Sequence, residues 1–291
     1  MVFPDFAWAA NQAGDPDVYE VENSAIDPGG VLDAALREVA PWAGRDLVDL
    51  GCGSGFWLPR YARTARSVTG VEPDPSLLDR ARARDPRVGV EPGSAEHIPL
   101  PDASVDVVHA RFAYFFPPGC DPGLAEVRRV LRPGGTLVVI DNDQRWGEFA
   151  ELLAGSPWAA AQGRADVTDA WWAERGARRR AVRSAWKFTT RADLKAVLRL
   201  EFPPLIADQW LREHPDRTGL TYARLCGWSG AQAAGPHPTL PRVGHRSSRV
   251  RTLAPTSVQA RRDWAALPQM MRRRSYGVHG LHAGRDVLDS A

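Results

Sequence analysis

The chain has 291 residues and a net charge of +2 at pH 7, and 44% of it is hydrophobic, enough for one large domain or one domain with appendages. No segment approaches the run of about 20 apolar residues that a membrane-spanning helix requires, and residues 1–36 hold neither Lys nor Arg, which argues against a signal peptide or presequence. The three cysteines, Cys52, Cys120 and Cys226, are too few and too scattered for a disulfide framework or a zinc site, so we expect a cytoplasmic protein.

Residues 24–42 (SAIDPGGVLDAALREVAPW) predict a helix that caps the sheet from the N-terminal side. Across residues 46–143, short β-branched apolar runs then alternate with helical segments, which is typical of a parallel sheet built from βαβ units. We expect five strands, at residues 47–50, 67–72, 88–93, 105–110 and 136–141. Helices are expected between them, at about 55–64, 75–84 and 121–131. The second helix has Asp74 as its cap and Pro75 at its first position, and the RPGG segment, residues 132–135, predicts a turn.

After the fifth strand, residues 144–177 are rich in Ala and Trp, and we expect them to form helical cover over the carboxyl edge of the sheet. Residues 181–188 (AVRSAWKF) predict a sixth strand, and residues 219–226 (GLTYARLC) predict a last one. Two helices are expected between these strands, at residues 189–202 and 203–215.

The periodicity disappears after Trp228. Residues 229–291 hold ten Arg, three Asp and neither Lys nor Glu, so this tail carries +7 and the total of +2 leaves −5 for residues 1–228. Its Pro, Gly, Ser and Arg content does not bury enough apolar surface to offset the entropy of ordering, so we expect disorder apart from a short helix at about 257–267.

A glycine-rich turn, DLVDLGCGSGFW at residues 46–57, joins the first strand to the first helix of the core. Gly51, Gly53 and Gly55 let the main chain pass close to a bound group, which suits a nucleoside ligand. A dinucleotide fingerprint, G-x-G-x-x-G, would need its third glycine where Phe56 stands. The turn therefore disfavours NAD and FAD.

The second expected strand ends in an acid, Glu72, about twenty residues after the glycine turn. An acid at this point of a βαβ unit accepts both hydroxyls of an adenosine ribose. Turn, spacing and terminal acid together indicate a site for an adenosine-containing ligand.

These motifs, VDLGCGSG and VTGVEPD, together with GSAEHIPLPDASVDVVHARFAYF and LAEVRRVLRPGGTLVVID, resemble the class I S-adenosylmethionine-dependent methyltransferases, in particular the small-molecule group with a type 11 methyltransferase domain. The resemblance covers residues 46–143 and extends more loosely to about residue 226. It implies an α/β fold with a Rossmann-like, mostly parallel seven-stranded sheet of order 3-2-1-4-5-7-6, an antiparallel seventh strand and helices on both faces.

The resemblance divides the chain into a methyltransferase domain at residues 1–228 and a basic, disordered tail at residues 229–291. The parts expected within the domain are an N-terminal cap at 1–45, a Rossmann-like core at 46–143, a helical cap insertion at 144–177 and C-terminal strands and helices at 178–228.

The resemblance also implies a set of residues around the cofactor, S-adenosyl-L-methionine. They are Asp49, Gly51, Cys52, Gly53, Gly55, Glu72, Pro73, Ser94, Ala95, Glu96 and Arg111. Those from Asp49 to Gly55 would surround the methionine and ribose part, Glu72 would hold the ribose hydroxyls and Pro73 would flank the adenine. Ser94 stands where the family often has an Asp that reads the adenine amino group, Ala95 would offer its backbone amide there, and Glu96 is a substitute acid.

Methyl transfer from a sulfonium is an in-line displacement, so the protein mainly aligns the nucleophile, the methyl group and the sulfur. A general base is needed only when the acceptor must lose a proton, and we take His109 and Asp141 as the candidates. Arg111 is better suited to pairing with a carboxylate of substrate or cofactor.

We expect no metal. Catechol-type O-methyltransferases bind magnesium with an Asp after the fourth strand and an Asp-Asn pair after the fifth. This chain has the pair, Asp141 and Asn142, after the fifth strand. After the fourth strand, however, it has His109 and Arg111 in place of the acid. The FFPPG segment, residues 115–119, also lacks the acid or amide that precedes Pro-Pro-aromatic in methyltransferases of nucleic-acid bases.

Aromatic residues outside the shared core would roof a pocket for a small, flat acceptor. They are Phe6, Trp8, Tyr19, Trp146, Trp158, Trp171 and Trp172. We therefore expect transfer of a methyl group to an oxygen, nitrogen or carbon of a small molecule, aromatic or otherwise flat, with no membrane or nucleic-acid partner. Two alternatives stay open, an RNA methyltransferase that uses the basic tail and a non-catalytic S-adenosylmethionine-binding protein, and the sequence leaves the oligomeric state undetermined.

Overall fold

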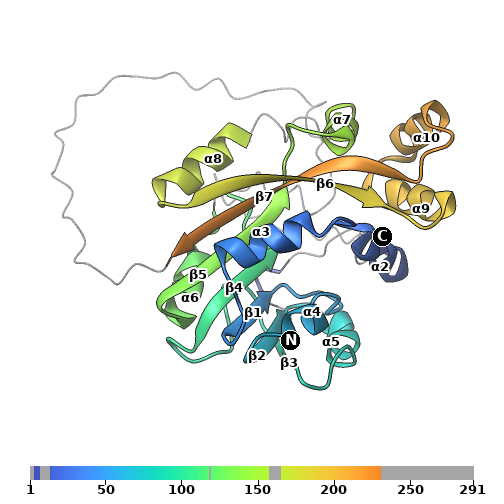
Figure 1. Ribbon diagram of the computed structural model, residues 1–291. Helices are drawn as coiled ribbons and strands as arrows, with labels where there is room; N and C mark the ends of the chain where they lie inside the picture. The colour runs from blue at the N-terminus through green and yellow to red at the C-terminus, as the bar shows by residue number, and fades with distance from the viewer. Residues whose placement is uncertain (1–2, 7–13, 118, 157–164, 231–291) are drawn as a thin grey trace, which may run out of the picture.

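The computed structural model describes residues 3–6, 14–117, 119–156 and 165–230, which form a seven-stranded sheet between two layers of helices (Figure 1). Most of the expected tail, including its short helix, lies outside the described residues, as do Trp8 and Trp158.

The strands follow the order β3-β2-β1-β4-β5-β7-β6, which confirms the predicted α/β fold and strand order. Strands β1 to β5 run parallel to one another, whereas β7 lies between β5 and β6 and is antiparallel to both. The strand bounds are β1 Asp46–Leu50, β2 Ser67–Glu72, β3 Gly89–Pro92, β4 Val105–Arg111, β5 Leu131–Asn142, β6 Arg178–Lys187 and β7 Gly219–Gly230.

Helices cover both faces of the sheet, because successive side chains of its buried strands point to opposite sides. Leu47 and Val107 join one core cluster with residues of α3, α4 and α9, whereas Val48 and Val108 join a second cluster with residues of α6 and α8. The helix bounds are α2 Pro16–Ala25, α3 Val31–Val39, α4 Leu58–Ala62, α5 Pro75–Arg82, α6 Asp121–Val130, α7 Glu148–Ala154, α8 Ala165–Glu174, α9 Arg191–Glu201 and α10 Pro204–Glu213.

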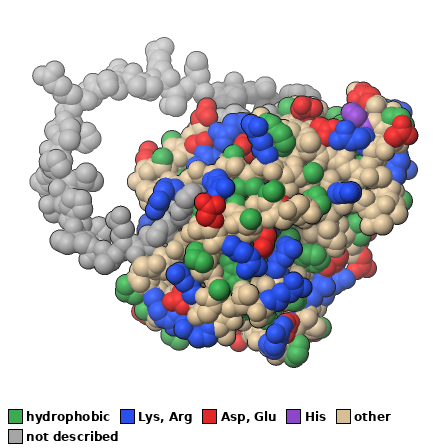
Figure 2. Space-filling view, viewed as in Figure 1, with side chains coloured by type: hydrophobic (Ala, Val, Ile, Leu, Met, Phe, Trp, Pro, Cys, Tyr) green, Lys and Arg blue, Asp and Glu red, His purple; other side chains and the backbone are tan. Residues whose placement is uncertain are grey.

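The outer surface mixes charges of both signs, and Lys and Arg side chains stand among acidic and apolar ones on the face seen in Figure 2. In the described part of the chain, the large apolar side chains that stay exposed are Val31, Val167 and Leu205. Most large apolar side chains of the described residues are therefore buried in the two clusters that flank the sheet.

The N-terminal cap differs from the prediction, since two helices stand where one was expected. The carboxylate of Asp15 accepts hydrogen bonds from the first turn of α2, a helix that shares only residues 24 and 25 with the predicted span. The DPGG segment interrupts the predicted helix, because Gly30 adopts a left-handed φ of 66° and Asp27 accepts hydrogen bonds from the amides of Leu32 and Asp33.

Two strand ends also differ. Leu131 already pairs with Val105, and the next paired residues are Val107 and Thr136, so the predicted RPGG turn forms a bulge inside β5. Strand β7 was expected to end at residue 226 but continues to Gly230, which pairs with Thr136.

Helix α4 is shorter than expected, because the glycine turn occupies the start of the predicted helix.

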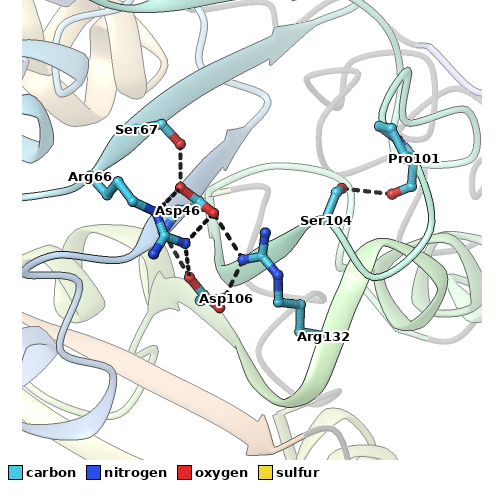
Figure 3. Close-up of polar contacts among 7 residues, drawn as sticks. All are labelled: Asp46, Arg66, Ser67, Pro101, Ser104, Asp106 and Arg132. Atoms are coloured by element: carbon cyan, nitrogen blue, oxygen red, sulfur yellow. Dashed lines mark hydrogen bonds and ion pairs between the residues drawn. The ribbon is translucent and has the colours of Figure 1, made fainter.

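An ionic network joins the amino ends of the parallel strands (Figure 3). Asp46 on β1 accepts hydrogen bonds from Arg66 Nε at 2.8 Å, Ser67 Oγ at 2.7 Å and Arg132 Nη1 at 2.9 Å. Asp106 on β4 accepts from the Asp46 amide at 2.9 Å and pairs with Arg132 at 2.9 Å. These bonds, led by those from Arg66, hold the pKa of Asp46 well below its usual range.

Replacing Asp46 with Asn should lower the free energy of unfolding at pH 7 by about 1 kcal/mol, because its arginine partners are exposed and their attraction is screened. A lowered folded-state pKa stabilises the fold above the unfolded Asp pKa of about 3.9, and this contribution is lost as the pH falls further. Urea unfolding should therefore show a difference between wild type and Asp46→Asn that shrinks towards pH 3 or so.

The matched control is Asp79→Asn, since Asp79 is 97% exposed and only loosely paired with Arg82 at 3.4 Å. It should leave stability unchanged. Equal stability of the Asp46 and Asp79 variants would contradict a structural role for the network.

Candidate functional site

The carboxyl ends of β1, β2 and β4 meet at one edge of the sheet, where the glycine turn follows β1. Gly51 has a φ of 73°, and a Cβ on it would lie 2.5 Å from the Cβ of Ala113 in the loop after β4. Gly55 has a φ of 76°, and its Cβ would lie 2.9 Å from the Cα of Ala81 in α5. Only glycine fits both positions, so the turn lies tightly between the β4 loop and α5.

Glu72 links the turns that follow β1 and β2. Its Oε2 accepts a hydrogen bond from the Gly53 amide at 2.7 Å, and its Oε1 accepts one from the Asp74 amide at 2.9 Å. Burial raises the pKa of Glu72 to about 7, although these two amides act in the opposite direction. Each carboxylate oxygen keeps a lone pair for a ligand hydroxyl, as the predicted ribose contact requires.

Asp49 and Arg111 lie beside the turn, on neighbouring strands. Burial raises the pKa of Asp49 to about 6, and the positive charge of Arg111 partly counters this effect. Arg111 donates to the Tyr61 hydroxyl at 3.2 Å, and its Cζ lies 4.1 Å from the centroid of the Trp57 ring. These contacts fix the guanidinium at the end of β4. The predicted pairing of Arg111 with a carboxylate of substrate or cofactor stays a prediction.

The residues predicted around adenine follow β3. Ser94 and Ala95 are buried, and no described residue hydrogen-bonds the Ser94 hydroxyl. Glu96 accepts a hydrogen bond from the Tyr114 hydroxyl at 2.7 Å, and its amide donates to Asp5 at 3.3 Å. Ser94 therefore offers a buried polar atom to a ligand, whereas the Glu96 side chain is already engaged.

The two predicted base candidates lie in different surroundings. His109 is fully buried in β4, with its ring centroid 5.5 Å from that of Trp42 and 5.2 Å from that of Tyr61. Burial lowers its pKa to about 3, so the imidazole is neutral. Asp141 is half-buried near the end of β5, and its Oδ1 accepts a hydrogen bond from the Asn142 amide at 2.7 Å.

A second, polar pocket adjoins this edge. It encloses a space of about 20 Å³, enough for one water molecule. We call it the polar pocket. It is lined by Tyr19, Glu22, Phe112, Asn142, Phe149, Trp186, Glu201, Tyr222 and Arg224. Of these residues, only Tyr19 was predicted from the sequence to line a pocket. The one signal for the rest was an arginine inside the apolar run of the last strand, GLTYARLC.

Three other aromatic residues proposed as a roof, Trp146, Trp171 and Trp172, pack elsewhere. Trp171 and Trp172 are buried together against the helical layer that contains α6, and Phe115 lies 6.2 Å from Trp172 between ring centroids. Trp146 contacts the Arg183 guanidinium, whose Cζ is 4.9 Å from its ring centroid. Tyr19 is thus the proposed roof residue that the structure places in a pocket.

In the described residues there is no group of three or more His, Cys, Asp or Glu side chains that could hold a metal ion. Asn142 Oδ1 instead accepts hydrogen bonds from the Tyr222 hydroxyl and from Arg224 Nη1. No helix in the same described ranges is long and apolar enough to cross a membrane.

Comparison with known proteins matches residues 48–139 to the family model of the methyltransferase domain. An uncharacterized methyltransferase of Mycobacterium tuberculosis is 41% identical over 122 residues, which cover 40% of this chain and 49% of that protein. A "Probable S-adenosylmethionine-dependent methyltransferase" of Mycolicibacterium smegmatis is 39% identical over 108 residues, which cover 33% of this chain and 38% of that protein. The chain thus spans about half, or less, of the length of these relatives.

Among solved structures, the S-adenosylmethionine-dependent methyltransferase of Mesorhizobium loti aligns with a TM-score of 0.41 and 19% identity, over 68% of this chain and 98% of that one. The family match and the named relatives agree with the resemblance drawn from the motifs, and the observed strand order agrees with the fold it implies. Residues 48–139 thus match a methyltransferase domain, and one relative that shares this part of the chain is named as S-adenosylmethionine-dependent.

Proposed function

We propose that the chain is a methyltransferase that moves a methyl group from S-adenosylmethionine to a small molecule. The observation that carries this proposal is the buried carboxylate of Glu72, held by the Gly53 and Asp74 amides beside the glycine turn. A carboxylate in this position is costly without a ligand, because burial disfavours its charge. Two ribose hydroxyls would supply the donors that offset this cost.

The surrounding residues fit the rest of the cofactor. Gly51 allows the turn to lie against the β4 loop, Gly53 would leave room for the ribose, and Asp49 would supply a buried carboxylate on the methionine side. The buried hydroxyl of Ser94 is available to the adenine amino group, and Pro73 would flank the ring. We assign these contacts to the cofactor, together with the backbone of Cys52, Gly55 and Ala95.

S-adenosylmethionine would supply an electrophilic methyl group on a sulfonium, so the chain itself must orient the acceptor and exclude water. The Arg111 guanidinium, fixed by Tyr61 and Trp57, is a positioning group at the end of β4. We assign His109 a packing role, since it lies between Trp42 and Tyr61 inside the core. Asp141 stays our candidate for a base.

The first test is calorimetric binding of S-adenosylmethionine and S-adenosylhomocysteine to the full chain, followed by release of S-adenosylhomocysteine in the presence of small acceptors. Binding of both compounds with turnover of an acceptor supports the proposal. Binding without turnover across oxygen, nitrogen and carbon acceptors would favour a non-catalytic binding protein. Failure to bind either compound would contradict the proposed cofactor site.

Glu72→Gln should weaken binding of S-adenosylhomocysteine by about 1–3 kcal/mol, the scale of lost hydrogen bonds to a charged group. Isothermal calorimetry at pH 8 measures the loss. The matched control is Glu91→Gln on β3, an exposed acid whose replacement should leave the affinity unchanged. Full affinity in the Glu72 variant would show that this acid does not contact the cofactor.

The affinity for S-adenosylhomocysteine should also depend on pH. Ribose hydroxyls bind the ionised form of Glu72, whose pKa lies at about 7 in the protein without ligand, so affinity should rise with pH through 7 and level off above it. Below pH 7 it should fall by up to about tenfold per pH unit. In the Glu72→Gln variant the rise in affinity around pH 7 should disappear, and only the effect of Asp49 ionisation near pH 6 should remain.

Calorimetry between pH 5.5 and 8.5 or so covers both transitions. A wild-type affinity that does not change over this range would contradict the assignment of Glu72.

A further inference from the structure

Arg224 is a buried cation inside the sheet. It lies on β7 with only 1% of its surface exposed, and its Cζ is 3.9 Å from the ring centroids of both Phe112 and Tyr222. The two rings hold the guanidinium in place in the wall of the polar pocket.

The hydrogen bonds of Arg224 leave one edge of the guanidinium open. Nη1 donates to Asn142 Oδ1 at 3.1 Å, and the same oxygen accepts from the Tyr222 hydroxyl. Nε and Nη2 have no hydrogen-bond partner among the described residues. These two nitrogens form the edge that grips a carboxylate with two parallel hydrogen bonds. Trp186, which lines the same pocket, has an indole N–H that is likewise buried and without a described partner.

One of the two acidic side chains in the pocket can be neutral beside Arg224. Burial and the neighbouring Glu201 raise the pKa of Glu22 well above its usual value, and the two carboxyl groups share a hydrogen bond. Glu22 can therefore shed its charge by taking up a proton. Arg224 cannot lose its charge in the same way, because a guanidinium stays protonated in proteins.

The polar pocket adjoins the proposed cofactor site. Phe112 directly follows Arg111 at the end of β4, and the Phe112 amide donates to the Ile140 carbonyl of β5 at 2.9 Å. The positive charges of Arg111 and Arg224 both act to lower the pKa of Tyr19, so Tyr19 lies close to both guanidinium groups. A small ligand seated on Arg224 would therefore extend towards the edge where the methyl group is expected.

We propose that the methyl acceptor is a small organic acid whose carboxylate binds Arg224 through Nε and Nη2 in the polar pocket. This inference rests on the proposed function and names its substrate class. The carboxylate head would lie against Nε and Nη2 of Arg224, and the remainder of the acceptor would extend towards Arg111. The pair of Glu22 and Glu201 would instead suit an amine, and the experiment includes that outcome.

The test compares matched probes on the full chain saturated with S-adenosylhomocysteine. Acetate, benzoate and phenylacetate are compared with acetamide, benzamide and phenylacetamide, and with ethylamine, benzylamine and phenethylamine, at constant ionic strength. Calorimetry and thermal shift should show binding by at least one acid and weaker or no binding by its amide and amine. Equal binding of an acid and its amide, a preference for amines or no binding by any acid would overturn the proposal.

Variants provide the second arm. Arg224→Gln and Arg224→Lys should weaken acid binding by about 10- to 100-fold, since neither side chain presents the two-nitrogen edge. Arg183→Gln, an exposed arginine on β6, should bind acids like the wild type. Unchanged acid binding in the Arg224 variants would also overturn the proposal.

Binding of S-adenosylhomocysteine is measured on every variant and reports on the proposed function separately. Loss of acid binding with retained S-adenosylhomocysteine affinity isolates the acceptor pocket. If the Arg224 variants fail to fold, the comparison of acids, amides and amines on the wild type decides the question by itself.

Discussion

The carboxylate of Glu72 holds the functional edge of the sheet together. Parallel strands end side by side, and the turns after them expose amides that no neighbouring strand can satisfy. Glu72 accepts one such amide from the turn after β1 and one from the turn after β2, so a single side chain at the end of β2 fixes both. The shape of the glycine turn, and with it the proposed cofactor site, depends on this bridge.

The two edges of the sheet treat buried charge in opposite ways. At the amino edge, Asp46 has arginine partners and a lowered pKa, so it stabilises the fold at neutral pH. At the carboxyl edge, burial raises the pKa of Glu72 and Asp49, so their ionised forms cost stability as the pH rises through 6 to 7. Polar groups that lower the stability of the unliganded fold are thus gathered where ligands would satisfy them.

The sequence predicts those features that follow from local pattern. The buried strands show as β-branched runs, and Glu72 shows by its spacing from the glycine turn. The bulge in β5 was missed because Pro and Gly signal a turn, and only the pairing of Leu131 with Val105 shows that the strand continues. The polar pocket was missed because α2, β5, β7 and α9 meet there only in the folded chain.

Helix α2 connects the two sites. Glu20 accepts a hydrogen bond from the Ser54 hydroxyl in the glycine turn and pairs with Arg84, which itself donates to the Ser54 carbonyl at 3.0 Å. The neighbouring Tyr19 and Glu22 line the polar pocket, one helical turn apart on one face of the helix. One helix therefore contacts both the glycine turn and the polar pocket, so the position of α2 affects the geometry of both sites.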